Sequence, residues 1–417
     1  MLTEAAAVVI GSGALGASTA FHLLKAGIGP VALIDQHAIG GETSPRAAGL
    51  TQQVRDSDLM TDLAHRSVAK ITGFARETGQ QLAYFQSGSM KIARTPGHAA
   101  QLRREVERGQ RLGIEIDLIS EAEAARRNPF LRPRGIAAVS FAKTDLYLEP
   151  GQIPRLYARA FAERGGVLLP HTRVNGLSST DGAVTEVATE RGSIRTRVVI
   201  DAAGAWTRLV GERCGARIGA VATRHQLFIT EPIDGVDAMQ PITRVIDCNV
   251  YMRPADGGLM LGGYEADPVQ ADMASLPAGF SIADLTLDIS VLRRLAEQID
   301  EQFPIFRGAA IREHRGGLPT MTADGEHILG PWPGLSGFYV LGGCCVGGLS
   351  IAPILGELAA TWVVSGSPGL DLSGLAPGRR AVADLDEASL LESCRRNYAY
   401  HYWAGETRPR EAAAASG

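Results

Sequence analysis

The 417-residue sequence is poor in several features that mark particular classes of protein. Its five cysteines include no Cys-x-x-Cys pair, so their spacing supports neither a zinc site nor a disulfide framework, and no bound metal is expected. They are Cys214, Cys248, Cys344, Cys345 and Cys394. Aromatic residues make up only 6% of the chain. What the sequence has in abundance is glycine, with 49 residues.

The chain also lacks a strong charge of either sign. It has 41 Lys and Arg against 45 Asp and Glu, a net charge of −4, and the basic residues are scattered rather than clustered. This pattern excludes the basic surface expected of a nucleic-acid-binding protein. The apolar stretch near the N-terminus has no basic leader and is interrupted by glycines. It therefore predicts neither a signal peptide nor a membrane span, and we expect a cytoplasmic protein.

The most informative stretch is residues 7–35. A short apolar run, residues 7–10, is followed by Gly-Ser-Gly-Ala-Leu-Gly, a helical segment, and a second apolar run that ends in Asp35. The pattern predicts a βαβ unit that binds a dinucleotide. Gly11 would allow the tight turn, Gly13 the approach of a pyrophosphate, and Gly16 the packing of the helix on the strand. The acid would accept hydrogen bonds from a ribose.

The loop that follows, residues 40–50, favours FAD over NAD. An NAD domain usually continues into another helix here, whereas this loop is rich in glycine and other small residues that would let backbone pack against a large flat ring. Arg46 could pair with a phosphate. An ordinary surface loop is the alternative.

Apolar and amphipathic runs predict the remaining elements. We expect another strand at 195–200, which closes on small residues, and a buried strand at 338–341 before the glycine loop 342–348. Helices are expected at 57–77, 99–112, 152–164, 290–302 and 351–364. Strands without an intervening helical rhythm are expected at 88–94, 136–141, 223–230, 244–253 and 258–263.

These elements predict an α/β chain (α+β overall), with a Rossmann-like FAD-binding domain and an inserted antiparallel-sheet substrate domain. The FAD-binding domain is assigned to residues 1–85, 145–215 and 311–370, and the substrate domain to residues 86–144 and 216–310. Residues 371–417 are expected to form a polar, irregular tail whose last residues, 411–417, are disordered.

With these segments identified, the chain resembles the FAD-dependent amine oxidoreductases of the D-amino-acid oxidase superfamily. Within it, the sarcosine and dimethylglycine dehydrogenase branch is most similar. The resemblance extends over nearly the whole chain. It rests on residues 11–16 with 35, 44–50, 201–206, 225–226 with 230–232, 251–253 with 258–265, 322–325, 342–348 and 398–403.

The resemblance implies a reaction and a cofactor site. A secondary or tertiary amine, of the N-methyl amino acid kind, would pass a hydride from the carbon next to nitrogen to FAD, and the imine would hydrolyse in water. Oxygen or another electron acceptor would reoxidise the flavin. The expected FAD contacts are Gly11, Gly13, Ala14, Leu15, Gly16, Asp35, Gln36, Ser44, Arg46, Ala48, Gly49, Leu50, Val174, Ala203, Gly204, Trp206, Gly343, Val346, Gly347, Gly348 and Leu349.

Four residues are candidates for contact with substrate. The family places a histidine near the substrate at the position of His225. Tyr251 and Arg253 alternate on one predicted strand and so share a face, from which they could hold a carboxylate. Arg315 is a rival anchor. The alternatives are a satisfied core histidine and a solvated strand face.

The sequence departs from the family pattern at three places. Pro45-Arg46 replaces a Trp-His whose histidine holds flavin covalently, and Gly317 replaces a cysteine that does so in monomeric sarcosine oxidases, so we expect non-covalent FAD. Leu318-Pro319 stands where glycine oxidases place a carboxylate-binding arginine. Two further interpretations stay open: a flavin-bearing subunit of a hetero-oligomer, and an NAD-binding dehydrogenase. Neither the amine nor the oligomeric state, homo- or hetero-oligomer, can be chosen from the sequence.

Overall fold

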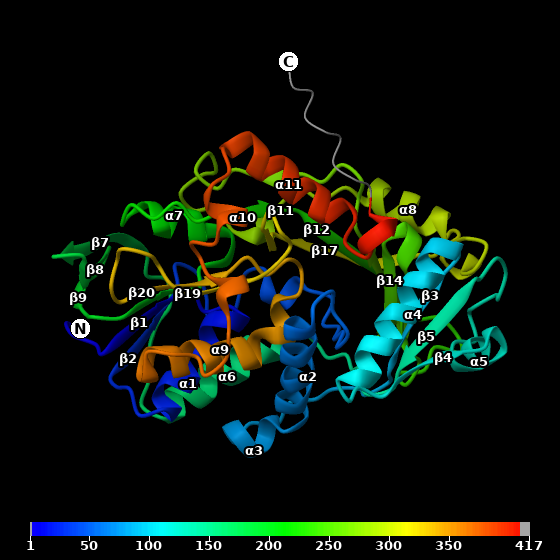
Figure 1. Ribbon diagram of the computed structural model, residues 1–417, viewed down its shortest axis with the longest axis horizontal. Helices are drawn as coiled ribbons and strands as arrows, with labels where there is room; N and C mark the ends of the chain where they lie inside the picture. Colours follow the sequence, from blue (N-terminus) through cyan, green and yellow to red (C-terminus); the bar gives the residue numbers. More distant parts are fainter. Residues whose placement is uncertain (1, 409–417) are drawn as a thin grey trace.

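The computed structural model describes residues 2–408 and contains two large sheets in different parts of the molecule (Figure 1). The first has six strands in the order β19-β20-β10-β1-β2-β6. Strand β1 (Ala7–Ile10) pairs in parallel with β2 (Val31–Ile34) and with β10 (Val199–Asp201). The apolar runs singled out in the sequence are thus neighbouring strands. The other members are β6 (Val167–Leu169), β20 (Phe338–Gly342) and the antiparallel edge strand β19 (Ile328–Pro331).

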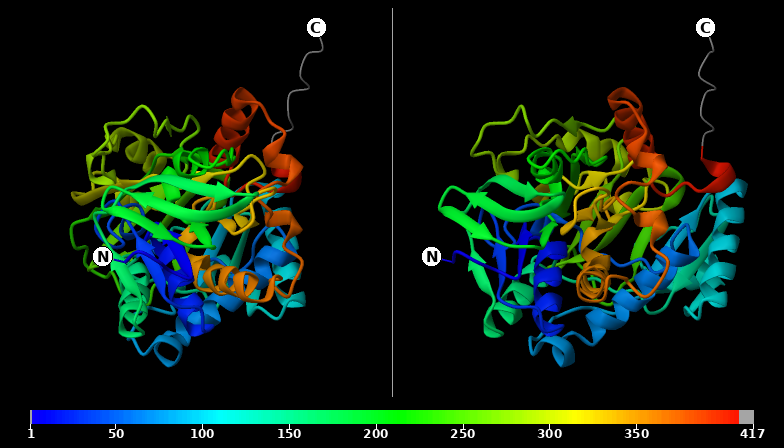
Figure 2. Two further views of the ribbon diagram at one scale, coloured as in Figure 1. Left: turned by 90° about the vertical axis from the view of Figure 1, so that its left-hand side faces the viewer. Right: turned by 60° about the vertical axis from the view of Figure 1, so that its left-hand side comes forward.

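Each face of this sheet is buried under a different layer, because successive side chains of a strand point to opposite faces. Ala7 and Val9 pack against helices, whereas Val8 and Ile10 pack against an antiparallel meander. The helices are α1 (Ala14–Lys25), α6 (Gln152–Glu163) and α9 (Gly348–Ser365). The meander consists of β7 (Val174–Thr180), β8 (Ala183–Thr189) and β9 (Gly192–Arg195), seen over the sheet in Figure 2.

Helix α9 is apolar along most of its length. It is the one helix within residues 2–408 that is long and apolar enough to cross a membrane by length and composition. It packs against α1 and α2 (Asp58–Thr72) in the core, where 61% of the apolar window is buried. Burial against neighbouring helices accounts for its apolar surface, as for other core helices.

The second sheet has eight strands in the order β17-β12-β15-β14-β13-β3-β5-β4. All neighbouring strands are antiparallel except β13 and β3, which pair in parallel. The strands are β17 (Ile311–Gly317), β12 (His225–Thr230), β15 (Gly258–Gly263), β14 (Val250–Ala255), β13 (Ile242–Val245), β3 (Ser89–Ala93), β5 (Ala138–Ala142) and β4 (Ile116–Ile119).

One face of this sheet is covered by α8 (Ile289–Gln298), where Phe228, Val245 and Met252 pack against it. Because side chains alternate along a strand, the residues beside these three point to the other face. That face carries His225, Arg244 and Tyr251 and is directed toward the first sheet. At the far end of the sheet, α4 (Pro96–Arg111) covers this face, and α5 (Glu121–Arg127) packs on the α8 face.

The strand predicted at 244–253 is two antiparallel strands, β13 and β14, joined by a short turn, and the strand predicted at 223–230 is divided between β12 and Val221–Thr223, which belongs to a small sheet. The structure differs from the predicted elements in three further places. Strand β17 pairs with β12 in the eight-stranded sheet, so residues 311–317 lie with the strands assigned to the substrate domain rather than with the FAD-binding sheet. The helix predicted at 57–77 is interrupted at Gly73, after which α3 (Phe74–Thr78) begins. Each part buries its own apolar residues.

The third difference concerns the C-terminal segment, which is not an irregular tail. It forms α10 (Arg380–Ala383) and α11 (Glu387–Ala399), and α11 crosses above β12 and β17 in Figure 1. A small sheet of β16 (Gln270–Ala271), β11 (Val221–Thr223) and β18 (Thr320–Met321) lies beneath it. A short helix, α7 (Thr207–Glu212), follows β10. The disorder expected for 411–417 falls outside the described residues.

Candidate active site

Two cavities meet at the carboxyl ends of β1, β2 and β10. We call them the nucleotide cavity, of about 430 Å³, and the reaction cavity, of about 170 Å³. They share five wall residues, which are Gly13, Thr43, Ser44, Ala202 and Gly204. Ligands of open α/β sheets bind at this edge. The two cavities together offer one continuous site for an elongated cofactor.

The start of α1 forms a narrow backbone cradle in the nucleotide cavity. A Cβ on Gly11 would lie 2.4 Å from the carbonyl oxygen of Ala202, and one on Gly16 would lie 1.8 Å from the carbonyl oxygen of Gly11. Glycine is therefore required at both positions. Gly13 caps the helix without a side-chain hydrogen bond, so backbone N–H groups and the positive end of the helix dipole face the cavity. This cradle suits a pyrophosphate.

Asp35 closes the same cavity at the end of β2. Its carboxylate accepts hydrogen bonds from the backbone N–H of Ser12, at 2.8 Å, and from the Ser12 hydroxyl, at 2.6 Å. The acid is thus held beside the glycine turn. It lines the nucleotide cavity with Gln36, Val174 and Trp206, all four of which the sequence predicted as cofactor contacts.

Most of the remaining predicted FAD contacts also line one of the two cavities. They are Gly11, Gly13, Ala14, Leu15, Ser44, Arg46, Ala48, Gly49, Leu50, Ala203, Gly204, Val346, Gly347, Gly348 and Leu349. Gly16 and Gly343 do not. Gly16 is packed on the strand turn, and a Cβ on Gly343 would lie 2.5 Å from Thr322 Cγ2, so Gly343 shapes the turn after β20.

Arg46 has a different role from the predicted phosphate partner. Its Nη1 donates hydrogen bonds to the carbonyl oxygens of Gly41 and Glu42, which fixes the loop that separates the two cavities. The guanidinium still borders the reaction cavity, as does Gly317. Neither residue offers a nucleophile for a covalent bond to flavin.

The N-terminus of α9 forms another wall of the reaction cavity. Its N-cap, Gly347, makes no side-chain cap, and no acidic residue lies in the first turn. Gly348, Leu349 and Ser350 border the cavity. A ring with negative charge would be stabilised there by the backbone N–H groups and by the helix dipole. The residues of both cavities therefore fit FAD.

His225 is held between two phenols in the reaction cavity. Its Nε2 lies 2.8 Å from the hydroxyl of Tyr251 and its Nδ1 lies 2.8 Å from the hydroxyl of Tyr398. Burial lowers the pKa of His225 to about 4, so the ring is neutral near pH 7. Burial also raises the pKa of Tyr251 and of Tyr398, so both phenols keep their protons.

The C-terminal segment supplies much of this aromatic environment. Tyr398 comes from α11, and His401 and Tyr402 follow it into the reaction cavity. The His401 ring stacks on Tyr264, with 4.1 Å between centroids. Residues 398–403 resemble the family pattern in sequence, but no hydrophobic periodicity in this segment predicts that it reaches the reaction cavity.

Two arginines that the sequence analysis missed also line the reaction cavity. Arg244, on β13, is only 3% exposed, and its Nη2 donates to the carbonyl oxygen of Thr51 at 2.8 Å. Its Nε and Nη1 are buried and have no hydrogen-bond partner among residues 2–408, while the guanidinium also lies beside the Tyr402 hydroxyl. Arg55 donates from Nη2 to the Ser350 hydroxyl at 3.3 Å, while its Nε is buried and unpartnered.

Arg244 and Arg55 contribute positive charge to the reaction cavity. Burial lowers the pKa of the Arg55 guanidinium, and the nearby Arg244 lowers it further. Among residues 2–408, those that line the reaction cavity include Arg46, Arg55 and Arg244 but no aspartate or glutamate. A buried guanidinium without an acid partner is costly, and an anion bound between these groups would remove that cost.

The two arginines predicted as anchors are occupied elsewhere. Tyr251 and Arg253 share a face of β14, as their alternation predicts, but Arg253 is 1% exposed and does not line the reaction cavity. It donates to the carbonyl oxygens of Ala48 and Pro254 and pairs with Glu149 at 3.0 Å. Arg315 pairs with Glu313 at 2.6 Å and is likewise absent from the wall.

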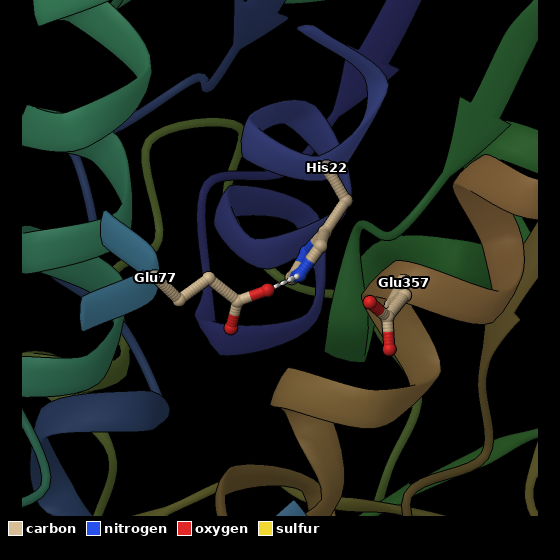
Figure 3. A group of neighbouring side chains, drawn as sticks. All are labelled: His22, Glu77 and Glu357. Atoms are coloured by element: carbon tan, nitrogen blue, oxygen red, sulfur yellow. Dashed lines mark hydrogen bonds and ion pairs between the residues drawn. The ribbon is translucent and has the colours of Figure 1, made fainter. Parts of the chain in front are cut away.

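One group of potential metal ligands lies far from this site, between α1, α3 and α9 (Figure 3). It consists of His22, Glu77 and Glu357. Lys70 already bridges the two carboxylates, at 2.7 Å from Glu77 and 3.2 Å from Glu357, and Lys25 adds a contact of 2.6 Å to Glu77. Two ammonium groups supply the positive charge that a metal would bring, so this cluster is an ion-pair network.

The family model "DAO: FAD dependent oxidoreductase" matches residues 6–362 of the chain. The chain belongs to this family. The membership favours FAD over the nicotinamide alternative and agrees with the predicted fold, a Rossmann-like domain with a second sheet.

Individual relatives support the same assignment. Mitochondrial sarcosine dehydrogenase from Mus musculus is 30% identical over 371 residues, which are 88% of this chain and 40% of that protein. Mitochondrial dimethylglycine dehydrogenase from the same species is 27% identical, over 94% of this chain and 46% of that protein. The chain thus spans less than half the length of these relatives.

Solved structures share the fold. L-proline dehydrogenase from P. horikoshii superposes with a TM-score of 0.81 at 24% identity, covering 90% of this chain and 98% of that one. Glycine oxidase from Geobacillus kaustophilus superposes with a TM-score of 0.79 at 22% identity, covering 90% and 99%. These likenesses show the fold alone.

Proposed function

We propose that the chain oxidises a secondary or tertiary amine that carries a carboxylate, an N-methyl amino acid-like substrate, with non-covalently bound FAD. The observation that carries the proposal is the wall of the reaction cavity. The buried Arg244 and the half-buried Arg55 line it with N–H groups that have no partner among residues 2–408, and none of the described residues on the wall is an aspartate or glutamate. A carboxylate satisfies these donors, whereas a polycationic amine finds no counter-charge.

The same charges prepare the amine for oxidation. The nitrogen must be neutral when the neighbouring carbon loses hydride, and positive neighbours lower the pKa of an ammonium group. Arg244 and Arg55 therefore favour the neutral amine beside the carboxylate that they bind. FAD bound in the two cavities would supply the two-electron acceptor for that hydride.

His225 and Tyr251 hold the other side of the substrate. A neutral imidazole has one N–H donor and one acceptor, so His225 sets the direction of the Tyr251 hydroxyl. When Tyr251 donates to Nε2, its oxygen can accept a hydrogen bond from the amine, and a proton leaving the nitrogen can reach the Tyr251 oxygen only as the phenol passes its own proton to Nε2. These residues position the amine and handle its proton, and the buried site excludes water from the reacting carbon.

The absence of a covalent flavin link is part of the proposal, since Arg46 and Gly317 stand at the two attachment positions of the related families. Among residues 2–408, Cys344 is the one cysteine on the reaction cavity wall, so it is the thiol to test for a covalent link.

The proposal is tested by anaerobic reduction of the purified yellow protein. We expect N-methylglycine, N,N-dimethylglycine and longer N-methyl amino acids to bleach the flavin, and the matched N-methylalkylamines without a carboxylate to react far more slowly. Bleaching that does not depend on the carboxylate would overturn the anchor, and no bleaching by any amine would overturn the activity.

A further inference from the structure

A third cavity adjoins the reaction cavity. It has a volume of about 490 Å³ and lies between α4, the end of α11 and the loop before β19. We call it the side cavity. Gln52, Arg55 and His401 line both it and the reaction cavity, so the two spaces meet at these residues.

His327 lines the side cavity and has no hydrogen-bond partner among residues 2–408. It is 4% exposed, and neither ring nitrogen makes a hydrogen bond. Buried polar groups are rarely left unpaired, so these atoms indicate a polar occupant.

The side cavity also carries unpaired charges of both signs. The Asp56 and Glu326 carboxylates form no ion pair or hydrogen bond among the described residues; Glu326 is half-buried and Asp56 is exposed at the cavity mouth. Arg104, also exposed, contributes a cation to the cavity lining. By contrast, Glu105 is paired with Lys91, and Asp324 with Arg379, each at 2.6 Å.

Because the side cavity carries charges of both signs, it favours some classes of ligand over others. A purely anionic group would be repelled by Asp56 and Glu326, and a purely cationic group by Arg55 and Arg104. An aliphatic group would leave all of these groups desolvated without a partner. A group that carries an ammonium and a carboxylate together satisfies both sets.

We propose that the side cavity is a second substrate subsite that binds the amino-acid head group of a long N-substituent. The substrate class is an N-(carboxymethyl) diamino acid, with the carboxymethyl group at Arg244, the secondary amine at Tyr251, and the zwitterionic head beyond Arg55. This inference rests on the proposed function and extends it.

The reaction with such a substrate balances. The carboxymethyl carbon loses a hydride, with its two electrons, to the flavin, and the nitrogen loses a proton as the C=N bond forms. Water then adds to that carbon and the C–N bond breaks, which yields glyoxylate and the free diamino acid. The electron acceptor takes the two electrons from the flavin.

The test compares three probes with the FAD-loaded protein under anaerobic conditions. They are N-methylglycine, Nε-(carboxymethyl)lysine and N-(carboxymethyl)pentylamine, which has the same chain without the head group. Flavin absorbance reports both binding and reduction. We expect Nε-(carboxymethyl)lysine to bind about 100-fold more tightly than the headless probe, as expected for two charge-assisted contacts.

Substitutions in the side cavity test whether the head group of the probe binds there. Glu326→Gln and Arg104→Gln should each weaken binding of Nε-(carboxymethyl)lysine about tenfold and leave N-methylglycine unchanged. Arg103→Gln and Glu107→Gln, on the exposed face of α4, are matched controls that should change neither probe.

Equal affinity for the probes with and without the head group would overturn the subsite, whether or not either reduces the flavin. So would a loss that is the same for all three probes. Failure of every probe to reduce the flavin, with the difference in affinity preserved, would instead overturn the proposed activity and leave the subsite standing.

Discussion

The imidazole Nε2 of His225 lies 2.8 Å from the hydroxyl of Tyr251, although the two residues come from β12 and β14, which are not adjacent strands. Gly262 of β15 lies between them, and a Cβ there would lie 2.3 Å from the Tyr251 hydroxyl oxygen. Glycine at this position leaves room for the tyrosine to reach across the intervening strand. The contact thus depends on three strands of one sheet.

Replacing His225 should slow chemistry more than binding. In His225→Ala the Tyr251 hydroxyl loses the partner that directs its proton, so we expect flavin reduction to slow about 100-fold with little change in affinity, within the usual range for a group that handles a proton. Anaerobic stopped-flow measurements separate the two quantities. His314→Ala, on the neighbouring β17, is the control and should behave as wild type. An affinity loss as large as the rate loss would contradict the role.

Replacing Arg244 should weaken substrate binding. Arg244→Gln removes the charge but keeps a polar side chain, and we expect the binding free energy of N-methylglycine to fall by about 1.5–3 kcal/mol, the size of a charge-assisted hydrogen bond. Arg315→Gln is the matched control, because Arg315 is paired with Glu313 away from the cavity. Equal losses in both variants would show that Arg244 does not anchor the carboxylate.

The rate of flavin reduction at saturating substrate should rise with pH as the bound amine loses its proton. His225 is not the group expected to titrate between pH 6 and 9, since its pKa is about 4 in the folded protein. Arg244 and Arg55 lower the pKa of the bound amine, so Arg244→Gln should move the midpoint of the profile to higher pH. Stopped-flow pH profiles of the two proteins measure the shift; an unchanged midpoint would argue against the electrostatic role.

FAD should leave the protein when it is denatured. Acid precipitation should release the yellow colour into the supernatant, because Arg46 and Gly317 provide no nucleophile. Colour that stays in the pellet would contradict this prediction, and its loss in Cys344→Ser would identify the attachment atom.

The glycine cradle should be essential for FAD binding. A Cβ on Gly13 would lie 3.2 Å from the Ser44 hydroxyl, and a valine side chain would also fill the space before α1. We expect Gly13→Val to fold without FAD, with far-UV circular dichroism as the check on folding. Gly374→Val is the control, since a Cβ there meets no atom within 4 Å. Full flavin content in Gly13→Val would show that the phosphates bind elsewhere.

Asp201 should make the protein less stable as the pH rises. Burial raises the pKa of the Asp201 carboxyl from its ordinary value of 3.8 to about 7. The folded chain keeps this proton where the unfolded chain releases it, so its contribution to the free energy of unfolding falls between about pH 4 and pH 7 and is constant above. The loss is on the order of 4 kcal/mol.

Asp201→Asn removes the titration while keeping an amide that can pair with Ala203 and Thr207, the present partners of the carboxylate. We therefore expect the wild type to lose stability relative to Asp201→Asn as the pH rises from 4.5 to 8, measured by urea unfolding at saturating FAD. A constant difference between the two proteins would contradict the raised pKa.

Local sequence determined the cofactor half of the site. The apolar run before Gly11, the glycine spacing and the acid at Asp35 each act within one βαβ unit, and the structure places them as predicted because their contacts are short in sequence. The glycine loop at 342–348 precedes a helix for the same local reason. The family assignment followed from these motifs.

Tertiary structure decided the substrate half. Arg244, Arg55 and Tyr398 lie on three segments far apart in the chain and meet only because the eight-stranded sheet and α11 pack over the carboxyl edge of the parallel sheet. Arg253 has the residue type and strand face of an anchor, yet Glu149 and the Ala48 carbonyl oxygen bind it. Whether a buried arginine is free for a ligand depends on which partners reach it through space, and alternation along one strand carries no information about them.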